Sequence, residues 1–260
     1  MTINVAPDWW KTLFDEVYLT TDARTVCNHE LTCREIDIFC KLISINPDDS
    51  LLDFCGGHGR HSLELYRRGY KKCTVFDYSH TLLRVGAENA ANLKCNIRFI
   101  QGDARNSQLE DEKYDHVMIL GNSLGYVPDE KSDFSILSES FRVLRSKGRL
   151  LLDVTDGKSV RERLMPIAWH EIGDDVVVCR QREVNNNYIY AREMVLSKKD
   201  GLIRDKNYCI RIYEKNYLKE LLGAAGFTDV NIFSQNSIAG INEADRGCMN
   251  HRLIITACKP

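Results

Sequence analysis

A glycine-rich segment near residue 55 constrains the fold of this chain more than any other feature of its sequence. An apolar run ends at Leu52, Asp53 follows, and three glycines between residues 56 and 59 precede a helical pattern that begins at Arg60. A strand, a tight turn and a helix in this order open a nucleotide-binding βαβ unit. Glycines let the backbone turn sharply, and their missing side chains leave room for a ligand against the main chain. Such a turn is weak evidence when taken alone, so its meaning depends on the residues that follow the later strands.

Strand patterns and helix patterns alternate after this turn. The apolar runs predict further strands at residues 73–76, 97–100, 114–120 and 149–154. Strands that alternate with helices in this way predict a parallel sheet with helices on both faces. The pattern then changes, and antiparallel strands are predicted at residues 175–184, 188–197 and 205–213. A helix at residues 214–225 and two more strands, at 229–233 and 252–258, complete the predicted elements.

Two helices are predicted before the glycine turn. Large apolar side chains recur at helical spacing over residues 8–19, namely Trp9, Trp10, Leu13, Phe14, Val17 and Tyr18. This helix either closes the core or forms a lid over a ligand, with Tyr18 as a contact. Thr32 and Glu35 have the spacing of a capping box and predict the start of the second helix.

Two carboxylates follow strands of the predicted parallel sheet, where ligands bind in open α/β folds. Asp77 ends the second strand, and its two oxygens can accept hydrogen bonds from a pair of ribose hydroxyls. Asp103 follows the third strand and could accept from an adenine amine, with Ala104 leaving space for the ring. The dinucleotide fingerprint is met only loosely at Ser62, so an adenosine without phosphates fits better. Both aspartates could instead merely cap helices.

At these residues the chain resembles the class I S-adenosylmethionine-dependent methyltransferases. The resemblance covers roughly residues 30 to 260, and its motifs are Asp53-Phe-Cys-Gly-Gly57-His-Gly59, Asp77-Tyr-Ser, Gly102-Asp103-Ala, Val143-Leu-Arg-Ser-Lys-Gly148 and Gly223-Ala-Ala-Gly-Phe227. One departure is Cys55, which stands where the family usually has its first glycine. The resemblance implies an α/β, Rossmann-like, seven-stranded mixed sheet with helices on both faces, a last strand that runs antiparallel and an inserted antiparallel β cap.

The resemblance also implies S-adenosyl-L-methionine as the cofactor. By position, the turn residues 55–57 contact its methionine portion, Asp77 its ribose, Tyr78 and Asp103 its adenine, and Leu120 lines the opposite side. The expected cofactor residues are Tyr18, Asp53, Cys55, Gly56, Gly57, Asp77, Tyr78, Asp103, Ala104, Leu120 and Gly121.

The expected domain organisation has four parts. Residues 1–30 form an N-terminal helical lid, 31–157 the cofactor-binding α/β core, 158–213 the antiparallel substrate cap, and 214–260 the C-terminal part of the core. The cap follows the fifth strand, as in small-molecule enzymes resembling the glycine and sarcosine N-methyltransferases. We therefore expect the methyl acceptor to bind beneath it.

The expected reaction is an in-line SN2 transfer of a methyl group to N, O or C of a small metabolite, which can be anionic. Alignment of the acceptor and exclusion of water carry most of the catalysis. A base is needed only if the acceptor enters protonated, and the candidates are His61, Tyr126, His170 and Tyr213. Each of these is also compatible with a packing or surface role.

The acceptor contacts are expected at the end of the fourth strand and on the cap. The candidates are Asn122, Arg180, Arg192 and Arg211, with Arg182 on the same strands. An arginine that faces the cleft suits a carboxylate or a phosphate, and Arg211 is the first choice. The alternative is that each arginine lies solvated on an exposed sheet face.

Composition narrows the partners. The 35 basic and 37 acidic residues are interspersed, which argues against binding of nucleic acid or an anionic membrane. No apolar run reaches the roughly 18 residues that a membrane span needs. The N-terminus lacks the pattern of a secretory signal, and the ten cysteines are scattered, so a cytoplasmic protein with reduced thiols is expected.

Cys27 and Cys33 could form a disulfide or bind a metal, but no CxxC pair or histidine spacing completes a site, and no metal is expected. A nicotinamide-dependent oxidoreductase and a non-catalytic module that binds S-adenosylmethionine remain as alternative functions. The sequence does not determine the acceptor atom or the oligomeric state.

Overall fold

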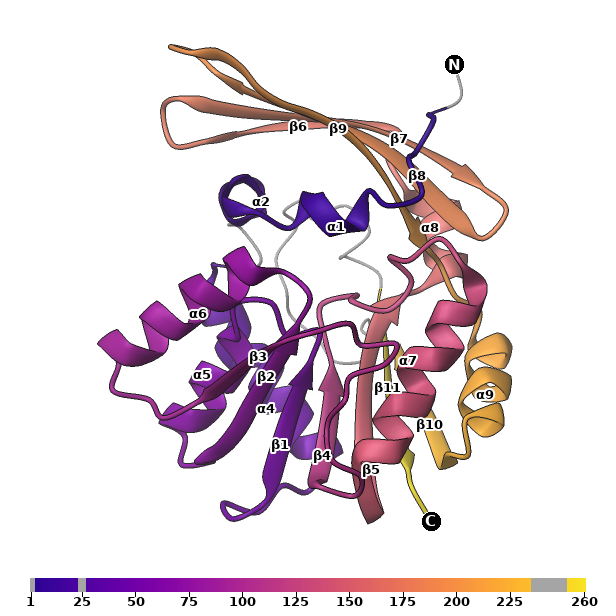
Figure 1. The fold of residues 1–260 in the computed structure, drawn as a ribbon. Coiled ribbons are helices and arrows are strands. Elements are labelled where there is room, and N and C mark those ends of the chain that lie inside the picture. The colour runs from indigo at the N-terminus through magenta and orange to yellow at the C-terminus, as the bar shows by residue number, and fades with distance from the viewer. Residues whose placement is uncertain (1–2, 23–26, 235–251) are drawn as a thin grey trace.

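Two β-sheets organise residues 3–22, 27–234 and 252–260, which this computed structural model describes (Figure 1). The larger sheet has seven strands in the order β10-β11-β5-β4-β1-β2-β3. Its strands are β1 Ser50–Phe54, β2 Lys72–Asp77, β3 Arg98–Gln101, β4 Tyr114–Ile119, β5 Leu144–Thr155, β10 Thr228–Ser234 and β11 Arg252–Cys258. Strand β11 runs antiparallel to both β10 and β5, whereas the other neighbouring pairs are parallel. The predicted mixed sheet with an antiparallel last strand is confirmed.

Helices cover both faces of this sheet. They are α4 His29–Leu42, α5 Arg60–Arg67, α6 His80–Asn92, α7 Glu130–Val143 and α9 Lys215–Ala224. Neighbouring residues of one strand supply opposite faces, because side chains alternate along a strand. Leu51 packs in the cluster that contains Ile36 of α4 and Leu65 of α5, and Leu52 packs with Leu137 of α7. Every helix in the described ranges is too short or too polar to cross a lipid bilayer.

The capping box predicted at Thr32 is wrong. Helix α4 begins at His29, and the Asn28 side chain caps it by accepting a hydrogen bond from the backbone N–H of Leu31. Glu35 is therefore in the middle of the helix, where its buried carboxylate meets residues of α5 instead of the helix end.

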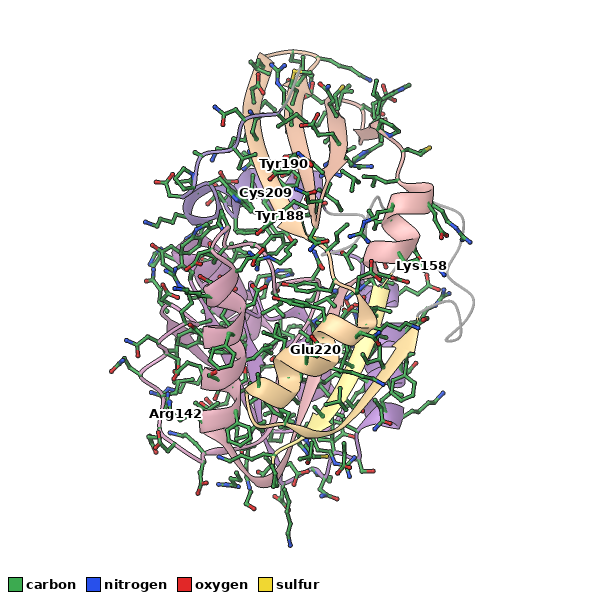
Figure 2. All side chains as sticks on the ribbon, turned by 90° about the vertical axis from the view of Figure 1, so that its right-hand side faces the viewer. Arg142, Lys158, Tyr188, Tyr190, Cys209 and Glu220 are labelled. Atoms are coloured by element: carbon green, nitrogen blue, oxygen red, sulfur yellow. The ribbon has the colours of Figure 1, made fainter. Side chains whose placement is uncertain are left out.

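The smaller sheet forms a cap beyond the carboxyl ends of the parallel strands (Figure 1). It is antiparallel, in the order β6 Ile167–Ile172, β7 Val176–Asn185, β8 Tyr188–Ser197 and β9 Gly201–Arg211, and α8 Gly157–Arg163 precedes it. Three of its strands were predicted and β6 was missed. Ile167 and Trp169 of β6 are exposed, so this edge strand does not show the usual apolar-in pattern. Tyr188, Tyr190 and Cys209 lie in the part of the cap next to the core (Figure 2).

The N-terminal segment lies between the cap and the core (Figure 1). It forms two short helices, α1 Trp10–Leu13 and α2 Glu16–Thr21, and not the single helix predicted over residues 8–19. Asp15 interrupts the pattern, because it has an extended backbone and its side chain caps α2 at the N–H of Tyr18. Hydrogen bonds join the segment to both neighbours: Lys206 of the cap donates to the Thr12 carbonyl at 2.6 Å, and Ser79 of the core to the Phe14 carbonyl at 2.6 Å.

Candidate functional site

A cavity of about 230 Å³ lies among the strand ends of the core, the N-terminal helices and the cap. All of the predicted cofactor residues line it: Tyr18, Asp53, Cys55, Gly56, Gly57, Asp77, Tyr78, Asp103, Ala104, Leu120 and Gly121. They come from the ends of β1, β2, β3 and β4 and from α2. The sheet therefore brings together residues that are far apart in the sequence, as open parallel sheets do at their carboxyl edge.

The turn after β1 leaves no space for a side chain at its centre. A Cβ atom on Gly56 would lie 2.5 Å from Cγ of Asp53. Cys55 has a φ of 62°, a left-handed conformation that favours glycine, so a strained cysteine occupies the family's glycine position. Asp53 is buried, and the Ser62 hydroxyl donates to its Oδ2 at 3.0 Å. Burial raises the pKa of Asp53 from 3.8 to about 6.

Both oxygens of Asp77 are oriented by the main chain. Oδ2 accepts a hydrogen bond from the N–H of Gly57, and Oδ1 accepts one from the N–H of Ser79, each at 2.8 Å. Burial raises the pKa of Asp77, and these backbone donors oppose the rise. The carboxylate thus ties the glycine turn to the end of β2, and its remaining lone pairs can accept from ligand hydroxyls.

Asp103 has a neighbour that the sequence reasoning missed. Arg105 donates from Nε to Asp103 Oδ1 at 2.9 Å, and this pairing lowers the pKa of the carboxyl group. The guanidinium of Arg105 lies 5.2 Å from the ring of Trp10, which in turn contacts the Tyr78 ring at 4.8 Å. The N-terminal helix therefore closes the end of the cavity where adenine is expected. The spacing Asp103-x-Arg105 could have indicated that this arginine pairs with Asp103. Nothing in the sequence indicates the contact between Trp10 and Tyr78.

A buried charge network formed by residues of α4, α5 and β11 supports the floor of the cavity, which is the surface that the core supplies. Glu35 accepts from Arg60 at 2.5 Å, from His61 Nε2 at 2.9 Å and from Arg252 at 3.1 Å. Burial would raise the pKa of Glu35, but these three neighbours hold it well below its usual range. Arg252 also pairs with Asp153, whose Oδ2 accepts from the N–H of Gly121 at 3.2 Å. Sequence reasoning missed this network, because its members are separated by up to 217 residues.

Comparisons with known proteins agree with this geometry. Residues 51–148 match the model of a methyltransferase domain family. The glycine/sarcosine N-methyltransferase of Aphanothece halophytica is 25% identical over 219 residues, which cover 79% of this chain and 76% of that protein. A glycine/sarcosine N-methyltransferase of Parasynechococcus marenigrum is 33% identical over 121 residues, 46% of this chain and 42% of that protein. The chain is a class I S-adenosylmethionine-dependent methyltransferase. This assignment replaces the nicotinamide-dependent alternative.

Solved structures share the fold of the methyltransferase. The CcbJ methyltransferase of Streptomyces caelestis superposes with a TM-score of 0.75 at 15% identity, over 96% of this chain and 99% of that chain. The sugar N-methyltransferase KedS8 of Streptoalloteichus superposes with a TM-score of 0.68 at 16% identity, over 100% and 98%. The cofactor is S-adenosylmethionine. The polar groups that line the cavity fit this cofactor. The carboxylates of Asp77 and Asp103 accept hydrogen bonds from hydroxyl and amine groups but repel a phosphate.

The predicted catalytic candidates of the methyltransferase separate into two groups. His61 and Tyr126 line the cavity, whereas His170 and Tyr213 do not. The Tyr213 hydroxyl donates to Asp133 at 2.7 Å inside the protein, and His170 is on β6 of the cap. His61 is bound to Glu35, and burial lowers its pKa to about 4. His61 is therefore a poor base at neutral pH.

The predicted acceptor residues are mostly placed elsewhere. Asn122 is buried beside β5, where its Oδ1 accepts from the Thr155 N–H at 2.7 Å, and it does not line the cavity. Arg192 is on the outer face of the cap and pairs with Asp205 at 2.5 Å. Arg211, the first choice, is wrong as a cavity residue: it is buried against Asp133 and over the Tyr188 ring. Each of these side chains satisfies a partner that the sequence pattern did not reveal.

Two cap arginines line the cavity, and their surroundings differ. Arg180 pairs with Glu193 at 2.7 Å and with Asp22 at 3.1 Å. Arg182 is only 8% exposed, and within the described residues it has no ion pair and its Nη1 has no hydrogen-bond partner. The other arginines that line the cavity each contact a carboxylate, namely Arg60, Arg105, Arg180 and Arg252.

Proposed function

We propose that this methyltransferase transfers a methyl group to a nitrogen atom of a small metabolite that also carries an anionic group. The observation that carries the proposal is Arg182, a buried guanidinium that lines the cavity without a carboxylate partner among the described residues. Burying an unpaired charge is costly, and a carboxylate or phosphate on the acceptor would remove that cost through charge-assisted hydrogen bonds. Arg182 takes the acceptor role that was first expected of Arg211.

The neighbours of Arg182 support an acceptor with separated charges. Arg182 and Tyr208 are on the same cap face, both opposite Ala191 in the sheet register. Glu193 and Asp22 also line the cavity, next to Arg180. Although both carboxylates are paired with Arg180, their remaining lone pairs would accept hydrogen bonds from an amine, and Arg182 would favour an anion on the same molecule. An amino acid or an amino sugar acid has this combination.

The chemistry of the lining residues favours nitrogen over oxygen. When bound, S-adenosylmethionine supplies an electrophilic methyl group on a sulfonium. The cap and the N-terminal helices exclude water, and Arg182 would orient the acceptor. His61 has a pKa lowered to about 4, and burial raises the pKa of Tyr208 well above its usual value, so neither group is an effective base at pH 7. An amine in its neutral form reacts without such a base. The names of the glycine/sarcosine N-methyltransferases and of the sugar N-methyltransferase KedS8 agree with nitrogen.

The test is a methyl-transfer screen that pairs each acceptor with an analogue lacking its anion. Small amino acids, their amides and amino sugars with and without a carboxylate are incubated with labelled S-adenosylmethionine. Arg182→Met should raise the KM of the preferred acceptor about 30-fold, which corresponds to the loss of one charged hydrogen-bonded contact. The affinity for S-adenosylhomocysteine should stay within about twofold, because Arg182 is on the cap side of the cavity.

Arg192→Met is the matched control, since it removes an equivalent charge from the outer face of the same sheet. It should leave both the KM and the cofactor affinity unchanged. Equal rates with the amides and the acids, or an unchanged KM in Arg182→Met, would contradict the anionic acceptor. Methylation of hydroxyl compounds only would contradict nitrogen as the acceptor atom.

A further inference from the structure

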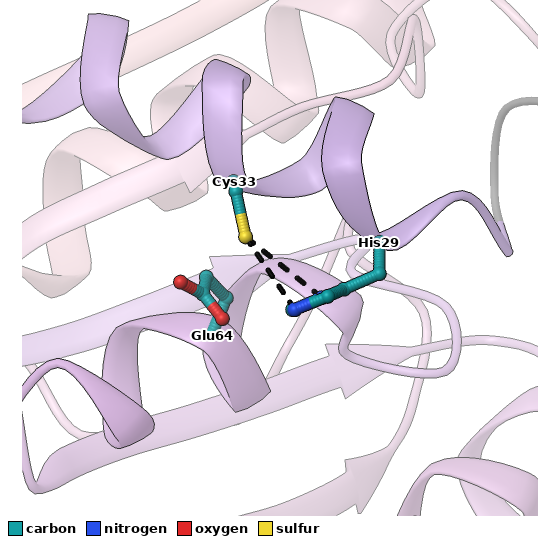
Figure 3. A group of neighbouring side chains, drawn as sticks. All are labelled: His29, Cys33 and Glu64. Carbon is teal, nitrogen blue, oxygen red and sulfur yellow. Dashed lines mark hydrogen bonds between the residues drawn. The ribbon is translucent and has the colours of Figure 1, made fainter.

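A cluster of three metal-ligating side chains lies outside the cavity, between helices α4 and α5 (Figure 3). His29 and Cys33 are four residues apart on α4, so both point from the same side of that helix. Glu64 comes from α5 and faces them. One nitrogen, one sulfur and one carboxylate oxygen of these residues all lie within 4.8 Å of one another.

The separation of sulfur and nitrogen matches that of two ligands on one metal ion. Cys33 Sγ lies 3.6 Å from Nε2 and 3.8 Å from Nδ1 of His29. Two ligands at the usual Zn–S and Zn–N distances, about 2.3 and 2.0 Å, are about 3.5 Å apart in a tetrahedron. His29 is exposed, so its ring can turn to direct either nitrogen at an ion.

The neighbours of Glu64 orient its carboxylate so that one oxygen, Oε2, can bind an ion. Arg68 donates from Nε to Glu64 Oε1 at 2.7 Å, and such outer hydrogen bonds commonly orient metal-ligating carboxylates. Oε2 is 3.6 Å from Nη1 of Arg67, whose side chain is 54% exposed. Arg67 can therefore swing into solvent when a cation binds, while Arg68 keeps the carboxylate in place.

We propose that His29, Cys33 and Glu64 form a binding site for Zn²⁺ or a similar borderline-soft divalent cation. Water would fill the fourth position of the tetrahedron. Binding converts the Cys33 thiol to a thiolate and releases its proton to solvent. The ion would join α4 to α5, the two helices that supply Glu35, Arg60 and His61 to the floor of the cavity. The sequence reasoning overlooked the His29-x-x-x-Cys33 spacing when it considered Cys33 with Cys27.

The test uses Co²⁺ as a spectroscopic probe on the full chain. Titration of the metal-free protein should give one equivalent of bound Co²⁺ with a thiolate-to-cobalt charge-transfer band in the near ultraviolet. Zn²⁺ should displace the probe and raise the Tm of the protein, because a ligand that binds only the folded state stabilises it. Mg²⁺ should do neither, since it prefers oxygen ligands.

Variants identify the ligands. Cys33→Ser should abolish the band and weaken Zn²⁺ binding at least tenfold, and His29→Ala and Glu64→Gln should each weaken binding. Cys95→Ser is the control, because it removes a partly exposed thiol near the end of α6. S-adenosylhomocysteine affinity reports that each variant is folded. A band that persists in Cys33→Ser, or Zn²⁺ binding equal in Cys33→Ser and Cys95→Ser, would overturn the proposal.

Discussion

The floor of the cavity is made of short turns that directly follow parallel strands, whereas its roof is made of the middle of long antiparallel strands. On the floor, Asp77 bonds to the N–H groups of Gly57 and Ser79, which are within 20 residues of it. On the roof, Arg180 pairs with Asp22, which is 158 residues away. The strand-end turns of the floor are therefore positioned by nearby main-chain groups, and the roof residues by side chains from other elements.

The two surfaces also differ in the charge that each leaves unpaired. The floor has a buried carboxyl group, Asp53, whose Oδ1 lacks a hydrogen-bond partner within the part of the chain that the structure describes. The roof has a buried guanidinium, Arg182, in the same situation. The remaining roof charges satisfy one another. A ligand that spans the cavity can therefore gain specificity from the floor through acceptors and from the roof through a cation.

The largest expected effect breaks the local geometry of the floor. Asp77→Ala removes a carboxylate that is oriented by two backbone donors and is predicted to accept from the cofactor ribose. Two charge-assisted hydrogen bonds contribute about 4 kcal/mol together, so the affinity for S-adenosylhomocysteine should fall about 1,000-fold. Isothermal titration calorimetry measures this change.

The control for this experiment is Asp48→Ala, which removes a carboxylate whose side chain is 97% exposed. It should leave the affinity unchanged. Circular dichroism on both variants checks that the fold is intact. If the affinity of folded Asp77→Ala for S-adenosylhomocysteine falls by less than about fivefold, this carboxylate does not bind the ribose. The assignment of roles on the floor would then be wrong.

The turn residues of the floor were predictable because they follow strands of a recognisable βαβ pattern. Asp77 and Asp103 could be assigned to one edge without knowing any tertiary contact, since carboxyl ends of parallel strands meet there. The same reasoning located Leu120 and Gly121. It did not find Arg60 or Arg252, because a buried ion pair across α4, α5 and β11 has no sequence pattern of its own.

The roof was not predictable to the same degree, because both faces of the cap sheet carry charges. Arg180 and Arg182 are two residues apart on β7 and share the inner face, whereas Arg192 of β8 is on the outer face. The pleat puts alternate residues on opposite faces, but the sequence does not say which face is covered. Without the core and the N-terminal helices in place, the sequence could not separate Arg182 from the other cap arginines, and Arg211 was ranked first.

The second prediction separates structural roof charges from ligand-binding ones. Arg211→Met leaves the carboxylate of Asp133 buried with the Tyr213 hydroxyl as its donor. Burial already raises the pKa of Asp133, and the loss of the opposing Arg211 charge makes its ionised form still less favourable. The free energy of unfolding should fall by about 3 kcal/mol, as measured in urea.

The control for Arg211 is a second substitution in the same cluster. Asp133→Asn added to Arg211→Met should recover part of the lost stability, because it removes the unpaired charge and keeps an acceptor for Tyr213. The acceptor KM of folded Arg211→Met should match that of the wild type. A KM increase similar to that of Arg182→Met would mean that the roof is not divided as described.

The smallest expected effect concerns the unpaired carboxyl group of the floor. Burial raises the pKa of Asp53 from 3.8 to about 6, against the opposing effect of Ser62 and Arg60. Because its pKa is higher in the folded state than in the unfolded one, Asp53 stabilises the fold fully only below about pH 4, and this contribution is lost as the pH rises through 6. Asp53→Asn, which stays neutral, should therefore be about 2 kcal/mol more stable than the wild type at pH 8 and nearly equal to it at pH 4. Urea unfolding at both pH values measures this difference. Asp115 and Glu139, whose pKa values lie at about 2, also reduce the stability at low pH, but this reduction cancels because both proteins share it. If Asp53→Asn is less stable than the wild type at pH 8, the ionised carboxylate has a cationic partner in the folded protein. The floor would then differ from the roof, because it would have no unpaired charge for a ligand to neutralise.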